Sequence, residues 1–175
     1  IVNWRVPSVS FSDYFDEIKR VNKLQIISIL LLPVVFTLGL LFDLLLIIVT
    51  KGIGDGRWSW FISATIAGFF LALKFKPTKI LTSGGPASAH LAGIIVGKLF
   101  SIPVIVELQD PLSGDGIGRN DEARGWLYKV EKFIINYADM TVYVTEEAAK
   151  FAKKQFNSSK ISFVYPGSRD FGIKH

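Results

Sequence analysis

The sequence predicts an α/β fold, a Rossmann-like parallel sheet with flanking helices. Beyond residue 78, four short strand patterns are each joined to the next by a helical pattern, and this alternation favours parallel strands with right-handed crossovers. The strand around residues 104–106 is continuously apolar, which is typical of a sheet covered on both faces. The length of 175 residues suits one domain, so we take residues 1–175 as a single Rossmann-like unit.

Caps, turns and hydrophobic periodicity predict where each element begins and ends. Strands are expected at residues 79–83, 103–108, 140–144 and 161–165. Helices are expected at residues 87–100, 121–137 and 146–156. The last helix has Thr145 as its cap, two glutamates in its first turn and lysines in its last turns, as the helix dipole favours. Nearer the N-terminus, residues 1–6 alternate like a strand, and a short helix is expected to end near residue 23.

The helix expected at residues 87–100 has one face made of small residues. Ala89, Gly93 and Gly97 recur at every fourth position, which places them on the same side of a helix. A helix face with so little side-chain bulk can approach another element closely. We therefore expect this face to pack directly on the sheet.

Two apolar stretches, residues 24–49 and 58–75, precede the alternating part of the chain. The first is long enough to span a bilayer, which takes roughly 20 residues. Basic residues flank the outer ends of the pair, so the positive-inside rule places those ends on the cytoplasmic face of a membrane. The alternative is a pair of buried or interfacial helices, since Pro33 would break the first and Asp43 would cost roughly 3 kcal/mol at mid-membrane. We expect residues 24–75 to form a membrane-embedded or interfacial insertion.

The composition restricts the class of ligand. The chain contains no cysteine, and its two histidines, His90 and His175, lie far apart without a metal-ligand pattern, so no metal site is expected. The net charge of +5 comes without any nucleic-acid-binding motif, which favours anionic lipid or a phosphate-bearing ligand over nucleic acid. Neither a dinucleotide-binding glycine motif nor a P-loop lysine is present, and no cofactor is expected.

The first candidate site follows the first strand of the alternating part, because ligands of open parallel sheets bind beyond the carboxyl ends of the strands. Its candidate substrate-binding residues are Ser83, Gly84, Gly85, Ser88 and His90. Glycine lets the backbone approach a ligand, and the following helix N-terminus offers N–H groups to an anion or a hydroxyl-rich ligand. The alternative is a tight turn that needs glycine for its geometry alone, with His90 as a structural residue.

The end of the next strand brings together Glu107, Gln109 and Asp110. Two acids and an amide at the end of a buried strand are costly unless they are paired or serve a ligand. A glycine-rich loop behind them could close over a bound molecule. The alternative is that the two carboxylates anchor this loop by accepting backbone N–H groups.

The last two strand ends complete the candidate site. Thr145 is primarily a helix cap, although its position also allows it to contact a ligand. Gly167 and Arg169 belong to a Tyr-Pro-Gly-Ser-Arg turn after the fourth strand. We interpret this turn as a linker into a further part of the protein.

Taken in order, these motifs resemble the N-terminal domain of family-4 type GT-B glycosyltransferases. The residues that carry the resemblance are the Thr-Ser-Gly-Gly-Pro-Ala-Ser-Ala-His segment at 82–90, the Glu-Leu-Gln-Asp-Pro-Leu segment at 107–112 and the Tyr-Pro-Gly-Ser turn at 165–168. The match covers about residues 57–172. The chain departs from the family pattern at Gln109, Leu112 and Ser168, which stand where arginine, tryptophan and asparagine are usual, and it lacks the family's first strand and glycine-rich phosphate loop.

The resemblance implies transfer of a sugar from a nucleotide-sugar donor to an acceptor held by this domain. Asp110 or Glu107 would activate the acceptor hydroxyl as a general base, and the other candidate residues would line the cleft. The donor would be bound mainly by a C-terminal domain or a partner subunit, so the chain alone is not expected to transfer sugar. A polyprenyl-phosphate or other lipid-linked acceptor would account for the apolar segment and its basic flanks. The alternative is a non-catalytic subunit that recruits a catalytic partner to the membrane.

Overall fold

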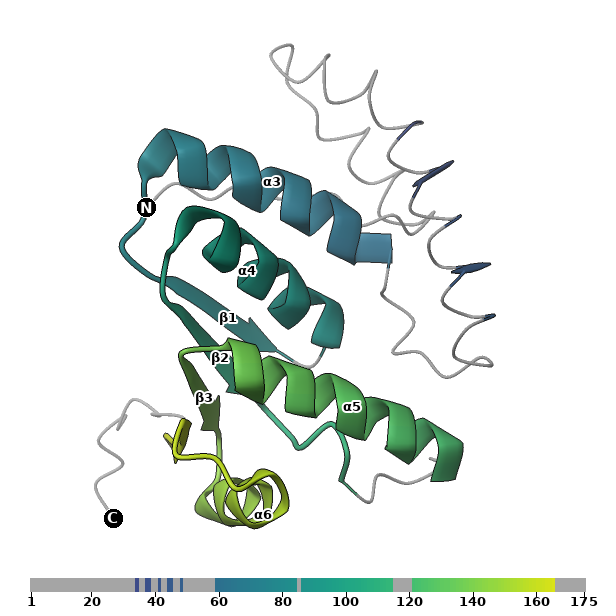
Figure 1. Cartoon of the computed structure of the whole chain (residues 1–175), viewed down its shortest axis with the longest axis vertical. Helices are drawn as coiled ribbons and strands as arrows, with labels where there is room; N and C mark the ends of the chain where they lie inside the picture. Colours follow the sequence, from purple (N-terminus) through teal and green to yellow (C-terminus); the bar gives the residue numbers. More distant parts are fainter. Residues whose placement is uncertain are drawn as a thin grey trace, which may run out of the picture.

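The structure, a computed structural model, describes residues 59–84, 86–114 and 121–165, with a few single helical positions between residues 34 and 48 (Figure 1). Helices and strands alternate strictly along these residues. In chain order they are α3 Ser59–Phe75, β1 Ile80–Gly84, α4 Ala87–Phe100, β2 Val104–Leu108, α5 Asp121–Tyr137, β3 Met140–Tyr143, α6 Glu146–Phe156 and β4 Ile161–Phe163. The expectations for residues 1–23 and for most of residues 24–49 lie outside the described residues.

The four strands form one sheet in the order β1-β2-β3-β4, and every neighbouring pair is parallel. The predicted parallel α/β architecture is therefore confirmed. The three helices between the strands begin and end where the sequence patterns placed them, with the last one starting directly after its Thr145 cap. Strands β2, β3 and β4 are shorter by one or two residues than their apolar patterns suggested, because pairing stops before those patterns do, whereas β1 has the expected length but begins and ends one residue later.

The small face of α4 packs on the sheet at Gly93 and Gly97. A Cβ atom at Gly93 would overlap the side chain of Thr82, and one at Gly97 would overlap the side chain of Val104. The close approach of α4 to β1 and β2 therefore depends on these two glycines, as predicted. Ala89 and Gly93 also line the groove between α3 and α4.

The helices α4, α5 and α6 lie on one face of the sheet. The order of the strands in the sheet is the same as their order along the chain. Successive right-handed crossovers therefore place every connecting helix on the same face of the sheet. The side chains beneath the helices are buried and include Val104, Val106, Leu108, Tyr143 and Ile161. On the opposite face Leu81 is 66% and Met140 44% exposed, whereas Val142 is buried. The three connecting helices thus cover one face of the sheet, and the expected cover on both faces stays a prediction, because most of the N-terminal part of the chain lies outside the described residues.

Helix α3 lies beside α4 at the β1 end of the molecule (Figure 1). Gly68 gives α3 its close approach, since a Cβ atom there would press on Val96 of α4. Phe69 and Phe100 pack with their ring centroids 5.2 Å apart. The second apolar stretch therefore packs chiefly on a helix. Among the described helices, none combines the length and the apolar composition that a bilayer crossing requires.

Candidate functional site

The carboxyl ends of the strands form one edge of the sheet, as parallel pairing requires. Gly84, Leu108, Tyr143 and Phe163 lie in register across it. Gly84 has φ of +133°, a conformation that side-chain-bearing residues rarely adopt, so glycine is needed where β1 turns towards α4. The chain leaves each of these strands at this edge, where the sequence placed its candidate residues. Three of those candidates, Gly85, Gly167 and Arg169, lie outside the described residues.

His90 ties the start of α4 to the end of β1. Its side chain is fully buried, with Nδ1 2.9 Å from the Thr82 hydroxyl and Nε2 3.1 Å from the Gly84 carbonyl oxygen. Because a carbonyl oxygen only accepts, Nε2 must carry the proton and Nδ1 then accepts from the hydroxyl of Thr82. Both ring nitrogens are thus engaged within the protein, and the geometry matches the structural alternative for this residue.

The two serines of this segment lie in different environments. Ser88 is fully buried on α4, and its hydroxyl has no hydrogen-bond partner. Ser83 is exposed on the sheet face away from the helices, where it lies in register with Glu107 of β2. The edge thus presents Gly84 to solvent more readily than Ser88 or His90, whose side chains point into the interior.

The carboxylates of Glu107 and Asp110 occupy different positions. Glu107 lies within β2, half-buried on the sheet face away from the helices, whereas Asp110 is exposed in the loop beyond the strand end. In the described part of the chain neither carboxylate makes a hydrogen bond or an ion pair, so neither anchors the loop. Gln109, between them, is also exposed. Asp110 therefore offers a negatively charged, unpaired group at the edge where ligands of such sheets bind.

The loop after β2 is anchored by Glu131, which the sequence reading did not identify. Glu131 lies on α5 and is fully buried. One carboxylate oxygen accepts from the Ser113 backbone N–H at 2.8 Å and from its hydroxyl at 2.5 Å, and the other accepts from the Tyr143 hydroxyl at 2.6 Å. The carboxylate thereby joins this loop to α5 and β3. Its signal in the sequence is a glutamate within the apolar stripe that Val130, Ile134 and neighbouring residues form on α5.

The Tyr143 hydroxyl is held in its protonated form by this arrangement. Burial raises the pKa of Tyr143 far above its ordinary range, and the charge and hydrogen bond of Glu131 act in the same direction. The phenol consequently remains a hydrogen-bond donor to Glu131. Since β3 ends at Tyr143, the hydrogen bond from the Tyr143 hydroxyl links the Glu131 carboxylate directly to the carboxyl edge of the sheet.

Thr145 caps α6 as predicted. Its hydroxyl oxygen accepts from the Ala148 backbone N–H at 3.2 Å, and its backbone is extended as an N-cap requires. Its side chain is half-buried, so its position at the strand edge leaves part of it accessible.

Taken together, the edge has a glycine turn fixed by His90, an exposed carboxylate at Asp110 and a loop fixed by Glu131. An unpaired carboxylate in such a position can accept a proton from a bound hydroxyl or hold a cationic group. Within the described residues no cluster of three or more His, Cys, Asp or Glu side chains forms that could hold a metal ion. No protein-family model and no curated protein sequence matches this chain.

Proposed function

We propose that the chain is the acceptor-binding half of a glycosyltransferase, built as a GT-B N-terminal domain, that acts on a membrane-linked acceptor. The observation that carries the proposal is the exposed Asp110 carboxylate at the carboxyl edge of a parallel sheet, which has no ion-pair or hydrogen-bond partner among the described residues. Sugar transfer to a hydroxyl needs a group that takes the hydroxyl proton as the glycosidic bond forms. The order of the motifs along the chain, described above, supports the same class.

In this proposal the roles of the residues follow from their positions. Asp110 acts as the general base, because it is exposed beyond the strand end, whereas Glu107 lies on the sheet face and contributes to binding with Ser83. Glu131 holds the loop of Asp110 in place through Ser113. The nucleotide-sugar donor is bound mainly by a C-terminal domain or a separate subunit, and the sugar acceptor is a polyprenyl-phosphate or another lipid-linked molecule.

The test is sugar transfer by the full chain produced together with the protein segment encoded directly downstream of it. Membranes are supplied with radiolabelled UDP- or GDP-hexoses, and label in the lipid fraction is counted. Asp110→Asn is expected to lower transfer by about 10²–10⁴-fold, the range that general-base catalysis supplies. Glu147→Gln is the matched control, because Glu147 is an exposed carboxylate in the first turn of α6 and the change removes the same charge.

Two results would contradict the proposal. Equal sugar transfer by the Asp110→Asn and Glu147→Gln proteins would show that Asp110 is not the general base. No transfer from any donor, although the chain still carries the downstream-encoded protein to the membrane fraction, would favour the non-catalytic recruiting subunit instead.

A further inference from the structure

Positive charge is concentrated in the α3–α4 layer. From Ser59 to Val106 the sequence contains no aspartate or glutamate, but it contains Lys74, Lys76, Lys79 and Lys98. Three of these lysines lie at the C-terminal end of α3 or directly after it. Residues 107–165, by comparison, contain nine acidic and eight basic residues, so their charges nearly cancel.

The outer face of α3 is apolar. Gly68 and Ala72 line the side of the helix that packs towards α4. Four large apolar side chains remain exposed on the rest of the helix, three of them on the opposite side and Phe69 at its border, where its ring also packs on Phe100 of α4. We call these four residues the α3 outer face: Ile66, Phe69, Phe70 and Leu73. Phe70 is 63% and Leu73 51% exposed. The exposed side of a surface helix is ordinarily polar, so a contiguous apolar face on α3 indicates a binding surface.

Two adjoining hollows lie on the other side of α3, towards α4, and the four outer-face residues line neither of them. A groove of about 340 Å³ runs between α3, α4 and β1 and is lined almost entirely by apolar residues such as Trp60, Ala64 and Leu81. A second hollow of about 400 Å³ lies at the C-terminal end of α3 and includes Lys76, Thr78 and Ser101. The two share Ala72 and Pro77 in their linings, so apolar and cationic surfaces meet at one place.

We infer that α3 docks in the headgroup layer of an anionic lipid bilayer, with its outer face against the acyl chains and the lysines at its C-terminal end on the lipid phosphates. Interfacial helices bind in this way when large apolar side chains adjoin a cationic rim. The inference rests on the membrane-linked part of the proposed function and assigns it to one helix. It does not depend on the sugar chemistry.

Charge complementarity selects a lipid surface over a second copy of the chain. If two copies joined through the α3 outer face, each would bring its own lysine-rich rim against that of the other, with no nearby carboxylate in the α3–α4 layer to pair with either. An anionic bilayer supplies both the apolar phase and the negative charge that this surface lacks.

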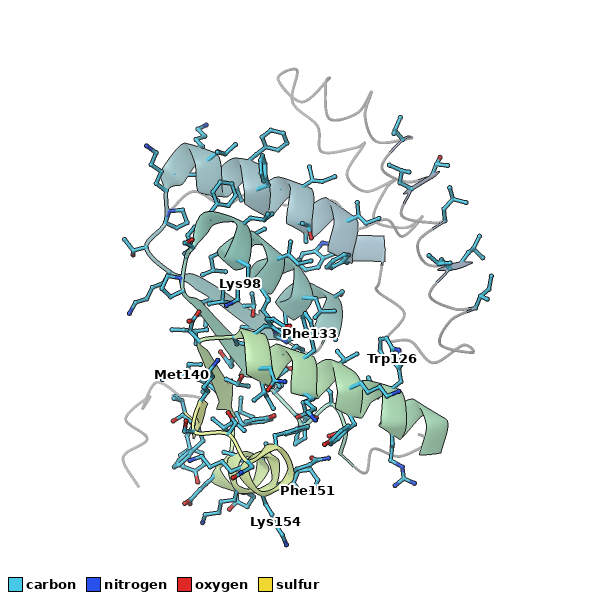
Figure 2. The ribbon with its side chains drawn as sticks, in the orientation of Figure 1. Lys98, Trp126, Phe133, Met140, Phe151 and Lys154 are labelled. Carbon is cyan, nitrogen blue, oxygen red and sulfur yellow. The ribbon has the colours of Figure 1, made fainter. Side chains whose placement is uncertain are left out.

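The first experiment uses the absence of cysteine from the chain to label single positions. Phe70→Cys in the full chain is labelled with an environment-sensitive fluorophore and mixed with vesicles of phosphatidylcholine alone or of phosphatidylcholine and phosphatidylglycerol in equal parts. Phe151→Cys is the matched control, since Phe151 is also exposed but lies on α6, at the end of the molecule away from α3 (Figure 2). We expect a blue shift and protection from an aqueous quencher at position 70 only, and mainly with the anionic vesicles.

The second experiment removes positive charge from the lysines at and directly after the C-terminal end of α3. Lys76→Gln with Lys79→Gln is expected to weaken binding to the anionic vesicles roughly thirtyfold, because each lysine near such a surface contributes about fivefold. Lys153→Gln with Lys154→Gln removes the same charge from α6 and should change binding little. Far-UV circular dichroism and thermal unfolding establish that each variant is folded.

Three outcomes would overturn the inference. In the first, the label at position 70 stays accessible to the quencher while the protein pellets with vesicles. In the second, the label is protected from the quencher even without vesicles, which would mean that another part of the chain covers it. If that protection increases with protein concentration, a second copy of the chain covers it instead. In the third, both lysine pairs weaken binding equally. Vesicle binding requires no sugar donor, so the two proposals can fail separately. If Asp110→Asn loses sugar transfer but docks normally on vesicles, the docking of α3 still holds. If docking fails in these experiments while Asp110→Asn lowers transfer as expected, the proposed sugar chemistry still holds.

Discussion

The Glu131 carboxylate satisfies three donors that come from two distant parts of the chain. Ser113 contributes its backbone N–H and its hydroxyl, and Tyr143 contributes its phenol. A buried charge is costly unless hydrogen bonds replace the water it has lost, and here both carboxylate oxygens are engaged. At the scale of single residues, this group does more to fix the loop before α5 than any other described contact of that loop.

Removing this carboxylate should destabilise the fold. Glu131→Ala leaves the buried donors of Ser113 and Tyr143 without an acceptor, and we expect it to lower the free energy of unfolding by about 3 kcal/mol or more. Lys132→Ala, a change at the next and exposed position of α5, should stay within about 0.5 kcal/mol of the unaltered protein. Urea unfolding followed by circular dichroism measures both, and similar midpoints for the two variants would show that the carboxylate is not an anchor.

At the scale of elements, α4 can lie close to the sheet because two of its residues have no side chain. Gly97 is the tighter of the two positions, since an added Cβ atom would approach both the Val104 side chain and, at 2.8 Å, the backbone oxygen of Ile102. A backbone atom cannot move aside as a flexible side chain can. The packing of α4 on β2 therefore restricts position 97 to glycine, even though alanine is the better helix former.

Two glycine-to-alanine substitutions in helices should consequently have opposite effects on the stability of the protein. Gly97→Ala is expected to destabilise the protein by about 1–3 kcal/mol through overpacking. Gly125→Ala, in α5, places its new Cβ atom in open space and should stabilise by up to about 1 kcal/mol through helix propensity. Thermal unfolding of the two variants side by side tests this difference. A stabilised Gly97→Ala protein would mean that α4 stands further from the sheet than described.

At the scale of the whole molecule, stability should decrease from the centre of the sheet towards its borders. Strands β2 and β3 are paired on both sides and lie beneath the helices, whereas β1 and β4 are paired on one side within the described residues. We therefore expect the slowest amide hydrogen exchange in β2 and β3. Hydrogen-exchange mass spectrometry of the full chain measures this order, and slower exchange in β4 than in β3 would contradict it.

The sequence predicts local features of this molecule better than its packing. The alternation of elements and the cap at Thr145 depend on residues close together in the chain, and both are confirmed. The placement of α4, α5 and α6 on one face depends on the direction of three crossovers, and the partners of Glu131 are 12 and 18 residues away from it, so neither follows from a local pattern. For His90 the sequence left a structural and a substrate-binding role open, and the contact with Thr82 across the turn, which supports the structural role, is not visible in a local pattern.

The separation of acids from lysines along the chain also has a consequence for motion in solution. Among the described residues, positive charge lies at one end and nearly balanced charge elsewhere, so this part of the molecule carries a permanent electric dipole with its positive pole at α3 and α4. Near any strongly negative object, the field exerts a torque that rotates the molecule before the two touch. Encounters would then begin with this pole leading, and the rate of such encounters would fall as added salt shortens the reach of the field.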